Sequence, residues 1–272
     1  MSASASRWTR IAGRLALAAG LVYAGALALL TWRQEALLFH PQTLPADHRF
    51  DLGGDVHETW VDVPGARLNA LHLRLPQPDG VVLYLHGNAG NLASWFTDLG
   101  AYRRANVDLF MIDYRGYGKS SGRIDSEAQL HADVRAAWDL IAPRYEGRRR
   151  TVMGISLGSG LAAALAAEVK PEMTVLVSPY VSMLELARLH YRWVPEAIVR
   201  YPLRTDLALP RVAGPLLLIH GERDELIPPS HSQRLAALAA QARLVIVPGA
   251  GHNDIDATPQ YRDELAAALR GR

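Results

Sequence analysis

Short apolar runs alternate with longer segments of helical periodicity along most of the chain. The runs are rich in Val, Ile and Leu and lack polar alternation, which is typical of strands buried on both faces of a sheet. They occupy residues 81–87, 107–114, 151–156, 173–178, 215–221 and 243–249. Segments with helical spacing of apolar residues lie between and after them, at 92–104, 126–142, 157–169, 230–240 and 258–270. This alternation predicts βαβ units and therefore an α/β fold with a mostly parallel, doubly wound sheet.

Two departures from this rhythm predict additional features. Residues 56–63 and 67–75 read as strands joined by Pro64-Gly65, a turn sequence, and so predict a hairpin before the parallel strands. Residues 179–214 make an unusually long connection between two strands, with aromatic residues scattered through it. Because this segment follows the carboxyl end of a strand, where sites of this architecture lie, it predicts a small lid. An ordinary crossover helix with irregular ends is the alternative.

Residues 15–32 form an uncharged apolar segment, LALAAGLVYAGALALLTW. As a helix it would be about 27 Å long, enough to cross the hydrocarbon core of a membrane. Three arginines precede the segment, and a tryptophan lies near each end. Positive charge is typical of the cytoplasmic side of a membrane segment. The sequence therefore predicts an uncleaved, single-pass anchor, with the N-terminus in the cytoplasm and the rest of the chain on the outer, extracytoplasmic side, as in a periplasm.

Two other interpretations of this segment remain open. A cleaved signal peptide would release a secreted protein, and Ala-Gly-Ala at 24–26 or Ala-Leu-Ala at 26–28 could serve as its cleavage site. A buried core helix is the other interpretation, although a helix that is apolar all round is unusual at an N-terminus. We therefore divide the chain into residues 1–32 as the membrane anchor or signal peptide, 33–54 as a connecting arm, and 55–272 as one α/β domain that carries the lid.

The amino-acid composition excludes several kinds of site and partner. The 272 residues and the 49% share of hydrophobic residues supply enough material for one large folded domain. The absence of cysteine excludes disulfides, thiol catalysis and Cys-based zinc or iron–sulfur sites. Twenty-nine basic residues oppose 27 acidic ones, and the densest basic run, at 148–150, is typical of a solvated turn. Nucleic acid is therefore not an expected partner.

The sharpest local motif is Gly-Ile-Ser-Leu-Gly at 154–158, between an apolar strand and an alanine-rich helix. In a G-x-S-x-G motif at such a junction, the serine occupies a strained turn between strand and helix, with its hydroxyl exposed. The pentapeptide alone is a weak signal, and its position between these two elements strengthens it. Ser156 is therefore the predicted nucleophile.

A serine hydroxyl needs a base, and the base needs an orienting acid. Asp224 lies just past the run at 215–221, and His252 lies on a glycine-rich turn just past the run at 243–249. Both side chains would therefore emerge at the carboxyl edge of the sheet beside Ser156, which predicts a triad of these three residues. Each could also be an ordinary loop residue. Four other acids are rivals of Asp224: Asp206, Glu222, Asp254 and Asp256.

The negative charge that develops on a substrate carbonyl needs backbone donors. The N–H of Leu157 follows the predicted nucleophile at a helix N-terminus and is the first expected donor. The second is expected from the loop after the run at 81–87, with the N–H of Asn88 preferred over that of Ala89. A tight turn without a catalytic role is the alternative for this loop.

Five motifs in order along the chain together resemble the α/β-hydrolase superfamily: HGNAGN at 86–91, DYRGYGKSSG at 113–122, GISLG at 154–158, HGERDELIP at 220–228 and GAGHND at 249–254. Among the branches of this superfamily, the motifs are most similar to the membrane-anchored, bud-emergence-like serine hydrolases, relatives of the serine-aminopeptidase-type hydrolases. The apolar N-terminal segment followed by ALLFHPQ at 36–42 also resembles that branch. The resemblance implies Ser156 as nucleophile, His252 as base, Asp224 as acid, and the N–H groups of Asn88 and Leu157 as oxyanion donors. Relatives include esterases, peptidases and thioesterases. Peptidases often carry a large helical cap, for which residues 179–214 leave little room.

These residues predict a serine hydrolase that cleaves carboxylic ester or thioester bonds through an acyl-enzyme intermediate. A serine nucleophile argues against haloalkane dehalogenase or epoxide hydrolase chemistry, which uses a carboxylate there. A small or lipid-like acyl substrate and the membrane are the expected partners, and no metal or organic cofactor is expected. A peptidase or amidase with the same triad and a non-catalytic, membrane-tethered binding protein are the alternatives. Seven side chains are candidates for an apolar acyl pocket: Tyr180, Met183, Leu184, Tyr191, Trp193, Leu226 and Ile227.

Overall fold

The computed structural model describes residues 2–271. Eight strands in this part of the chain form the central sheet: β2 (Val56–Val63), β3 (Ala66–Leu73), β4 (Gly80–Leu85), β6 (Val107–Ile112), β7 (Arg149–Ile155), β8 (Met173–Val177), β9 (Leu216–Gly221) and β10 (Ala242–Val247). They lie in the order β10-β9-β8-β7-β4-β6-β3-β2. β3 pairs antiparallel with β2 and with β6, and every other neighbouring pair is parallel. The prediction of a mostly parallel sheet is confirmed.

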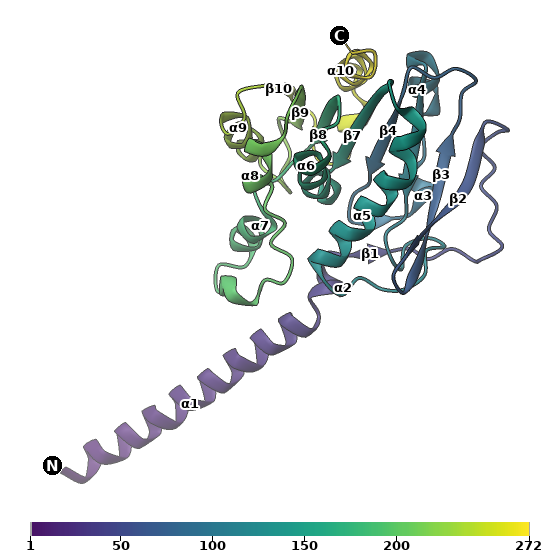
Figure 1. Cartoon of the computed structure of the whole chain (residues 1–272). Coiled ribbons are helices and arrows are strands. Elements are labelled where there is room, and N and C mark those ends of the chain that lie inside the picture. Colours follow the sequence, from purple (N-terminus) through teal and green to yellow (C-terminus); the bar gives the residue numbers. More distant parts are fainter. Residues whose placement is uncertain (1, 272) are drawn as a thin grey trace.

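Strands β2 and β3 form the hairpin that Pro64-Gly65 predicts. Their register runs from Val56 opposite Leu73 to Val63 opposite Ala66. Gly65 has a φ of +76°, in the left-handed region where a side chain would be strained. A tight turn at this point therefore favours glycine, and the hairpin forms one edge of the sheet (Figure 1).

Helices cover both faces of the sheet, and each face has its own apolar cluster (Figure 1). Every residue of β4, β6 and β9 is buried, which explains their continuous apolar sequences. One face packs against α5 (Glu127–Ile141), α6 (Leu157–Val169) and α9 (Ser230–Ala237), and the other against α4 (Leu99–Ala105) and α10 (Pro259–Leu269). Two 3₁₀ helices complete connections between these elements: η1 (Ala142–Tyr145) and η4 (Ile255–Ala257).

The single helix predicted at 92–104 is instead two helices, α3 (Leu92–Trp95) and α4. The chain turns after Phe96, whose side chain is buried, and Asp98 takes a left-handed φ of 47° before α4 begins. Apolar residues keep helical spacing across this break, at Leu92, Phe96 and Leu99. Periodicity alone therefore could not reveal it.

Helix α1 (Ser2–Trp32) projects away from the sheet and its covering helices (Figure 1). By length and composition, its segment Arg7–Trp32 could cross a membrane, and the most apolar part of that segment is not buried against the rest of the chain. This exposure contradicts the interpretation as a core helix. An anchor and a signal peptide both remain compatible with it, and the side of the membrane on which each end lies stays a prediction.

The residues after α1 include one strand of a second, two-stranded sheet. Helix α2 (Gln34–Leu38) is followed by β1 (His40–Pro41), which pairs in parallel with β5 (Ala89–Gly90).

The segment predicted as a lid contains four short helical elements: α7 (Met183–His190), η2 (Glu196–Ile198), α8 (Thr205–Ala208) and η3 (Leu209–Arg211). Helix α7 lies on the side of the molecule from which α1 extends (Figure 1). The division of the chain into anchor, arm, domain and lid stays a prediction.

Candidate active site

Ser156 lies at the turn between β7 and α6, at the carboxyl edge of the sheet. Its φ of 51° and ψ of −121° are a sparsely populated conformation that the surrounding contacts must hold. The Ser156 N–H donates to the Val177 carbonyl of β8 at 2.9 Å, and the Ser156 carbonyl accepts from the Ser159 N–H at 2.9 Å. The backbone of the predicted nucleophile is thus fixed from both sides.

Two glycines beside Ser156 allow α6 to approach the sheet closely. A Cβ at Gly154 would lie 2.3 Å from the Gly158 carbonyl oxygen, and a Cβ at Gly158 would lie 2.1 Å from the Leu85 carbonyl oxygen of β4. Both distances are far shorter than van der Waals contact, so a side chain at either position would push the helix away from the strands. The glycines of the motif therefore set the position of the serine turn.

The structure brings Ser156, His252 and Asp224 together at this edge of the sheet. His252 Nε2 lies 3.0 Å from Ser156 Oγ, and His252 Nδ1 lies 2.7 Å from Asp224 Oδ2. Asp224 follows β9 and His252 follows β10, which is why the carboxyl ends of these neighbouring strands bring them to the serine. The His252 side chain is 12% exposed, and the Asp224 side chain is fully buried. The three groups form a hydrogen-bonded chain from a buried carboxylate to a hydroxyl.

Asp224 is held as a carboxylate by several donors. Its Oδ1 accepts from the N–H groups of Leu226 at 3.0 Å and Ile227 at 2.8 Å, and His220 Nε2 lies 3.3 Å from its Oδ2. Burial raises the pKa of Asp224, but hydrogen bonds from His220, His252 and the Ile227 N–H outweigh burial and keep this pKa well below its usual range. An ionised acid therefore faces the His252 ring at neutral pH.

Three of the four rival acids have partners of their own. Asp206 pairs with Arg204 at 2.8 Å, Glu222 accepts from the Gly249 N–H at 2.9 Å, and Asp254 accepts from the Gly251 N–H at 2.6 Å. Within residues 2–271, the one carboxylate that contacts His252 is that of Asp224. Asp254 instead stabilises the glycine turn from which His252 projects.

The predicted oxyanion donors border one space with the serine. Asn88, Ser156 and Leu157 line the same cavity, whereas Ala89 does not. In the part of the chain that the structure describes, the N–H groups of Asn88 and Leu157 donate to no protein acceptor. Leu157 is also the first residue of α6, where unpaired N–H groups and the helix dipole favour negative charge. Both N–H groups are available to an oxygen bound beside Ser156.

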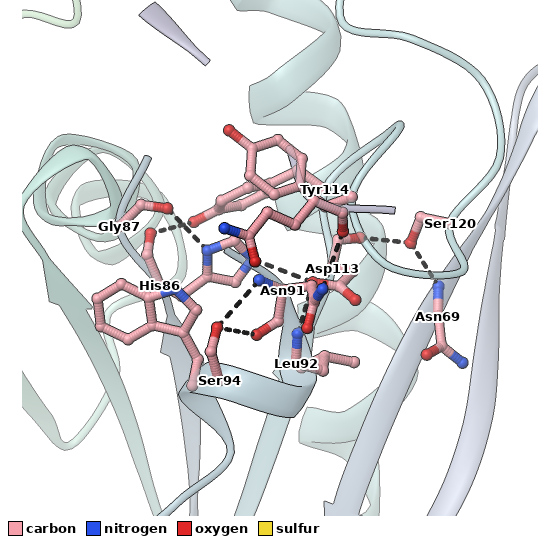
Figure 2. Close-up of polar contacts among 12 residues, drawn as sticks. Asn69, His86, Gly87, Asn91, Leu92, Ser94, Asp113, Tyr114 and Ser120 are labelled. Atoms are coloured by element: carbon pink, nitrogen blue, oxygen red, sulfur yellow. Dashed lines mark hydrogen bonds and ion pairs between the residues drawn. The ribbon is translucent and has the colours of Figure 1, made fainter. Parts of the chain in front are cut away.

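Carbonyl hydrogen bonds hold the loop that carries Asn88. The Tyr114 hydroxyl donates to the His86 carbonyl at 2.9 Å, and the Tyr117 hydroxyl donates to the Asn88 carbonyl at 2.7 Å. The His86 ring bonds the Gly87 carbonyl at 2.8 Å (Figure 2). Burial raises the pKa of both tyrosines, so their hydroxyls stay protonated and donate. Because the C=O and N–H of a trans peptide point in opposite directions, the bonded Gly87 carbonyl turns the Asn88 N–H the other way.

Asp113 connects this loop to the segment that follows β6. Its Oδ1 accepts from the Leu92 N–H at 3.0 Å and lies 3.5 Å from His86 Nε2, and its backbone carbonyl accepts from the Ser120 hydroxyl at 2.8 Å (Figure 2). The motifs at 86–91 and 113–122 therefore meet in space. Sequence reasoning assigned no role to Tyr114 or Tyr117, although both lie in the second of these motifs.

A cavity of about 280 Å³ adjoins the serine and has an apolar lining without a charged side chain among the described residues. Five predicted pocket residues line it: Tyr180, Met183, Tyr191, Leu226 and Ile227. Leu184 and Trp193, which were also predicted, are not part of this lining. Leu184 is half-buried, and the exposed Trp193 ring packs edge-on against Tyr23 of α1.

Ten further lining residues were missed by sequence reasoning. Four come from α1 and α2, namely Leu30, Gln34, Leu37 and Leu38. The other six come from the predicted lid: Leu186, Ala187, Val194, Ile198, Val199 and Tyr201. The apolar spacing within α7 could have indicated Leu186, but the contribution of α1 depends on how the lid folds, which the sequence pattern does not contain.

Within residues 2–271, no group of three or more His, Asp or Glu side chains is placed to hold a metal ion. The side chains gathered around Ser156 are instead those of general acid–base and nucleophilic chemistry.

Comparison with known proteins shows the family to which the chain belongs. Residues 76–210 match the family described as serine aminopeptidase, S33, a segment that includes Ser156 but ends before Asp224 and His252. Human alpha/beta hydrolase domain-containing protein 17B is 33% identical over 211 residues, which are 74% of this chain and 70% of that protein.

Solved structures share the fold at lower identity. An esterase of Pyrococcus furiosus aligns with a TM-score of 0.69 at 18% identity, over 86% of this chain and 97% of the esterase. A membrane phospholipase A described as a bacterial virulence factor aligns with a TM-score of 0.62 at 20% identity, over 98% of each chain. The protein is therefore a member of the α/β-hydrolase superfamily, as its motifs predict, and a hydrolase.

Proposed function

We propose that this hydrolase cleaves carboxylic ester or thioester bonds through an acyl-enzyme formed on Ser156. One observation carries the proposal: the two hydrogen bonds that join Ser156 Oγ to His252 Nε2 at 3.0 Å and His252 Nδ1 to Asp224 Oδ2 at 2.7 Å. This arrangement gives the hydroxyl a base, and gives the base a buried anion that fixes its tautomer.

In the first half of the reaction, Ser156 Oγ attacks the substrate carbonyl while its proton moves to His252 Nε2. Asp224 accepts the Nδ1 proton in a hydrogen bond and stabilises the imidazolium that forms. The carbonyl oxygen gains negative charge and accepts from the N–H groups of Asn88 and Leu157, each worth about 2–4 kcal/mol of barrier in such sites. The bond to the leaving oxygen or sulfur then breaks, and His252 returns the proton to it.

In the second half, water replaces the leaving group. His252 takes a proton from the water as its oxygen attacks the acyl carbonyl, and the same two N–H groups hold the oxyanion. The bond between the acyl carbon and Ser156 Oγ breaks, and His252 gives the proton back to the serine. The products are a carboxylic acid and an alcohol or thiol, and no redox partner is consumed.

The lining of the cavity favours an acyl compound over a peptide. A peptidase that recognises a free N-terminus needs an acidic group to bind the ammonium, and the described lining contains none. The names of the structural neighbours, an esterase and a membrane phospholipase A, point the same way. The match to a serine aminopeptidase family keeps an amidase as the second candidate, because the same triad can cleave amides.

We further propose that α1 remains attached as a membrane anchor, with its N-terminus in the cytoplasm and the sheet domain outside. The exposure of the apolar segment Arg7–Trp32 and the arginines near its N-terminal end support this orientation. A glycosylation or protease-protection map of the full chain in membranes tests it directly.

The proposed nucleophile is tested with the full chain, a fluorophosphonate probe and p-nitrophenyl esters. We expect Ser156→Ala to abolish labelling and to lower ester turnover by at least about a thousandfold, with the melting temperature almost unchanged. Ser230→Ala, which changes an exposed serine, is the control and should behave as wild type. Wild-type turnover in Ser156→Ala would refute the assignment. A wild-type chain that neither labels nor hydrolyses any ester would favour the binding protein.

A further inference from the structure

The lid touches the predicted membrane anchor directly. The Tyr23 hydroxyl of α1 donates to the Trp193 carbonyl at 2.9 Å, and the two rings meet edge-on with centroids 6.3 Å apart. Tyr23 lies nine residues before the end of α1 at Trp32. That separation is about 13 Å along a helix axis. The lid therefore extends along the anchor and not merely to its end.

A second set of contacts joins the lid to the residues just after α1. Gln34 Nε2 donates to the Ile198 carbonyl at 2.9 Å, and Gln34 Oε1 accepts from the Arg200 N–H at 2.5 Å. The buried Tyr201 hydroxyl donates to Glu35 Oε1 at 2.8 Å. Two sets of contacts thus join the lid, one to α1 and one to the residues just after it, and these segments form one structural unit.

The cavity that contains Ser156 adjoins the second set of contacts, since Gln34, Ile198 and Tyr201 line it. The anchor side contributes Leu30 of α1 and Leu37 of α2, and the lid side contributes residues such as Leu186 and Tyr191. One wall of the candidate acyl pocket is therefore made by the end of the helix that is expected to enter the membrane. Most side chains of this lining between α1 and the serine are apolar, and none of them is charged.

The outer surface of the same unit is apolar as well. Leu189 and Tyr191 of the lid are each 51% exposed and Trp193 is 49% exposed, while Trp32 of α1 is 73% exposed. A surface of this kind is costly in water, and aromatic side chains are typical of membrane interfaces. Because Trp193 lies beside Tyr23, a membrane crossed by α1 would also surround the lid tip, which we define as residues 188–196.

The charged lid residues are compatible with this placement. Arg188 pairs with Glu196, which lowers the cost of bringing either near lipid. Arginine side chains are also long enough to reach the headgroup region from an element lying in the interface. The lid tip thus has the mixed apolar and basic character of an interfacial segment.

We propose that the lid tip lies in the bilayer leaflet on the side of the sheet domain, and that the substrate is a lipid ester of that leaflet. Its acyl chain passes sideways from the bilayer, between α1 and the lid, to Ser156. Water then cleaves the ester to a fatty acid and an alcohol, as in the mechanism above. This inference rests on the proposed function, because it names the substrate of the same site.

The position of the lid is measured without reference to activity. The chain has no cysteine, so Leu189→Cys and Leu238→Cys each provide a single site for a nitroxide label. Leu238, which is 45% exposed and lies just after α9 and outside the lid segment at 179–214, is the matched control. In vesicles of phosphatidylcholine and phosphatidylglycerol, we expect the label at 189 to be accessible to oxygen and protected from a water-soluble nickel complex. The label at 238 should show the reverse. A water-accessible label at 189 would overturn the proposal.

The route of the substrate is measured with Leu189→Asp and its control Leu238→Asp in the full chain. We expect the first variant to lower hydrolysis of vesicle phospholipid about tenfold, the size of effect of removing one leucine from lipid, and to leave p-nitrophenyl acetate hydrolysis within twofold of wild type. The control should change neither rate. Equal rates on vesicle lipid for both variants would overturn the inference while the short ester still supports the function. Loss of Ser156-dependent turnover of every ester would instead refute the proposed function itself.

Discussion

Two regions meet at Ser156, and they differ in which side chains they bury: one buries polar groups, and the other leaves apolar groups exposed. The proposed catalytic rim, which we define as Ser156, His252, Asp224 and the loop at 86–88, buries polar groups and joins its three side chains by hydrogen bonds, while the Asn88 N–H stays available to a substrate oxygen. The lid–anchor wall, defined as α7 to η2 with the residues of α1 and α2 that line the cavity, leaves apolar side chains exposed.

The difference shows what each region needs in order to work. In the catalytic rim, a fully buried carboxylate is stable because it accepts from two backbone N–H groups and a histidine. The rim therefore needs no group from outside the protein, and its polar groups are in place for the charge of the reaction before substrate binds. The exposed rings and leucines of the lid–anchor wall gain nothing comparable from water, and the bilayer that we propose around them would remove this apolar surface from water. The rim should set the rate of bond cleavage, and the wall should set which substrate arrives.

Asp224→Asn is the variant that we expect to impair the catalytic rim most while leaving the lid–anchor wall unchanged. We expect kcat for a short p-nitrophenyl ester to fall about ten-thousandfold, because an amide can hold the wrong tautomer of His252 and cannot stabilise its cation. Steady-state kinetics measure this loss. The fall should be the same for short and long acyl chains, because the wall is untouched.

The exposed neighbour Glu225 provides the control for this variant. Glu225→Gln removes one negative charge from the same turn without touching His252, so its kcat should stay within about twofold of wild type. If Glu225→Gln lost as much activity as Asp224→Asn, the general charge of the turn, and not the contact with His252, would be responsible.

The rim was also the more predictable region. Continuous apolar runs identify parallel strands buried on both faces, and the observed bounds of β7, β9 and β10 lie within two residues of the predicted runs. Catalytic residues in this architecture follow strand ends, so the sequence alone places Asp224 and His252 near Ser156. Locating the strands therefore also locates the site, because neighbouring parallel strands end at the same edge of the sheet.

The wall could not be predicted in the same way. Its decisive contact joins Tyr23 to Trp193, which are 170 residues apart, and neither neighbourhood carries a periodic signal for the other. Leu30 and Leu37 line the cavity because α1 and α2 lie beside the lid, which also rests on contacts between segments far apart in the sequence. Trp193 was expected in the pocket because it is aromatic and lies in the lid, but its ring turns to the anchor. Packing between irregular segments is set by side-chain shape in three dimensions, which a pattern of apolar positions does not encode.

The wall can be perturbed alone with Leu30→Trp. The larger ring would occupy part of the cavity beside α1, so long acyl chains should lose contact area equivalent to about two methylene groups. We expect the ratio of kcat/KM for a sixteen-carbon ester to that for a two-carbon ester to fall about tenfold. A chain-length series of p-nitrophenyl esters measures it.

Leu29→Trp makes the same change at the next residue, which is 56% exposed and does not line the cavity. Its chain-length ratio should match wild type within about twofold. If both variants changed the ratio equally, the effect would come from α1 in the membrane and not from the wall of the cavity.

The smallest expected effect tests whether the rim depends on the tyrosines behind its loop. Tyr117→Phe removes the hydroxyl that donates to the Asn88 carbonyl at 2.7 Å, but this carbonyl keeps its hydrogen bond from the His40 N–H at 2.8 Å. No buried acceptor is left unpaired, so the fold should survive, while the Asn88 N–H is held less firmly against the developing oxyanion. One neutral hydrogen bond is worth about 1 kcal/mol, and we expect kcat to fall about fivefold at every chain length with KM unchanged. Tyr102→Phe, a buried tyrosine whose hydroxyl contacts Met153 Sδ at 3.9 Å, is the control and should keep wild-type kcat. A change confined to long chains would mean that the loop belongs to the wall, because only the wall should distinguish one acyl chain from another.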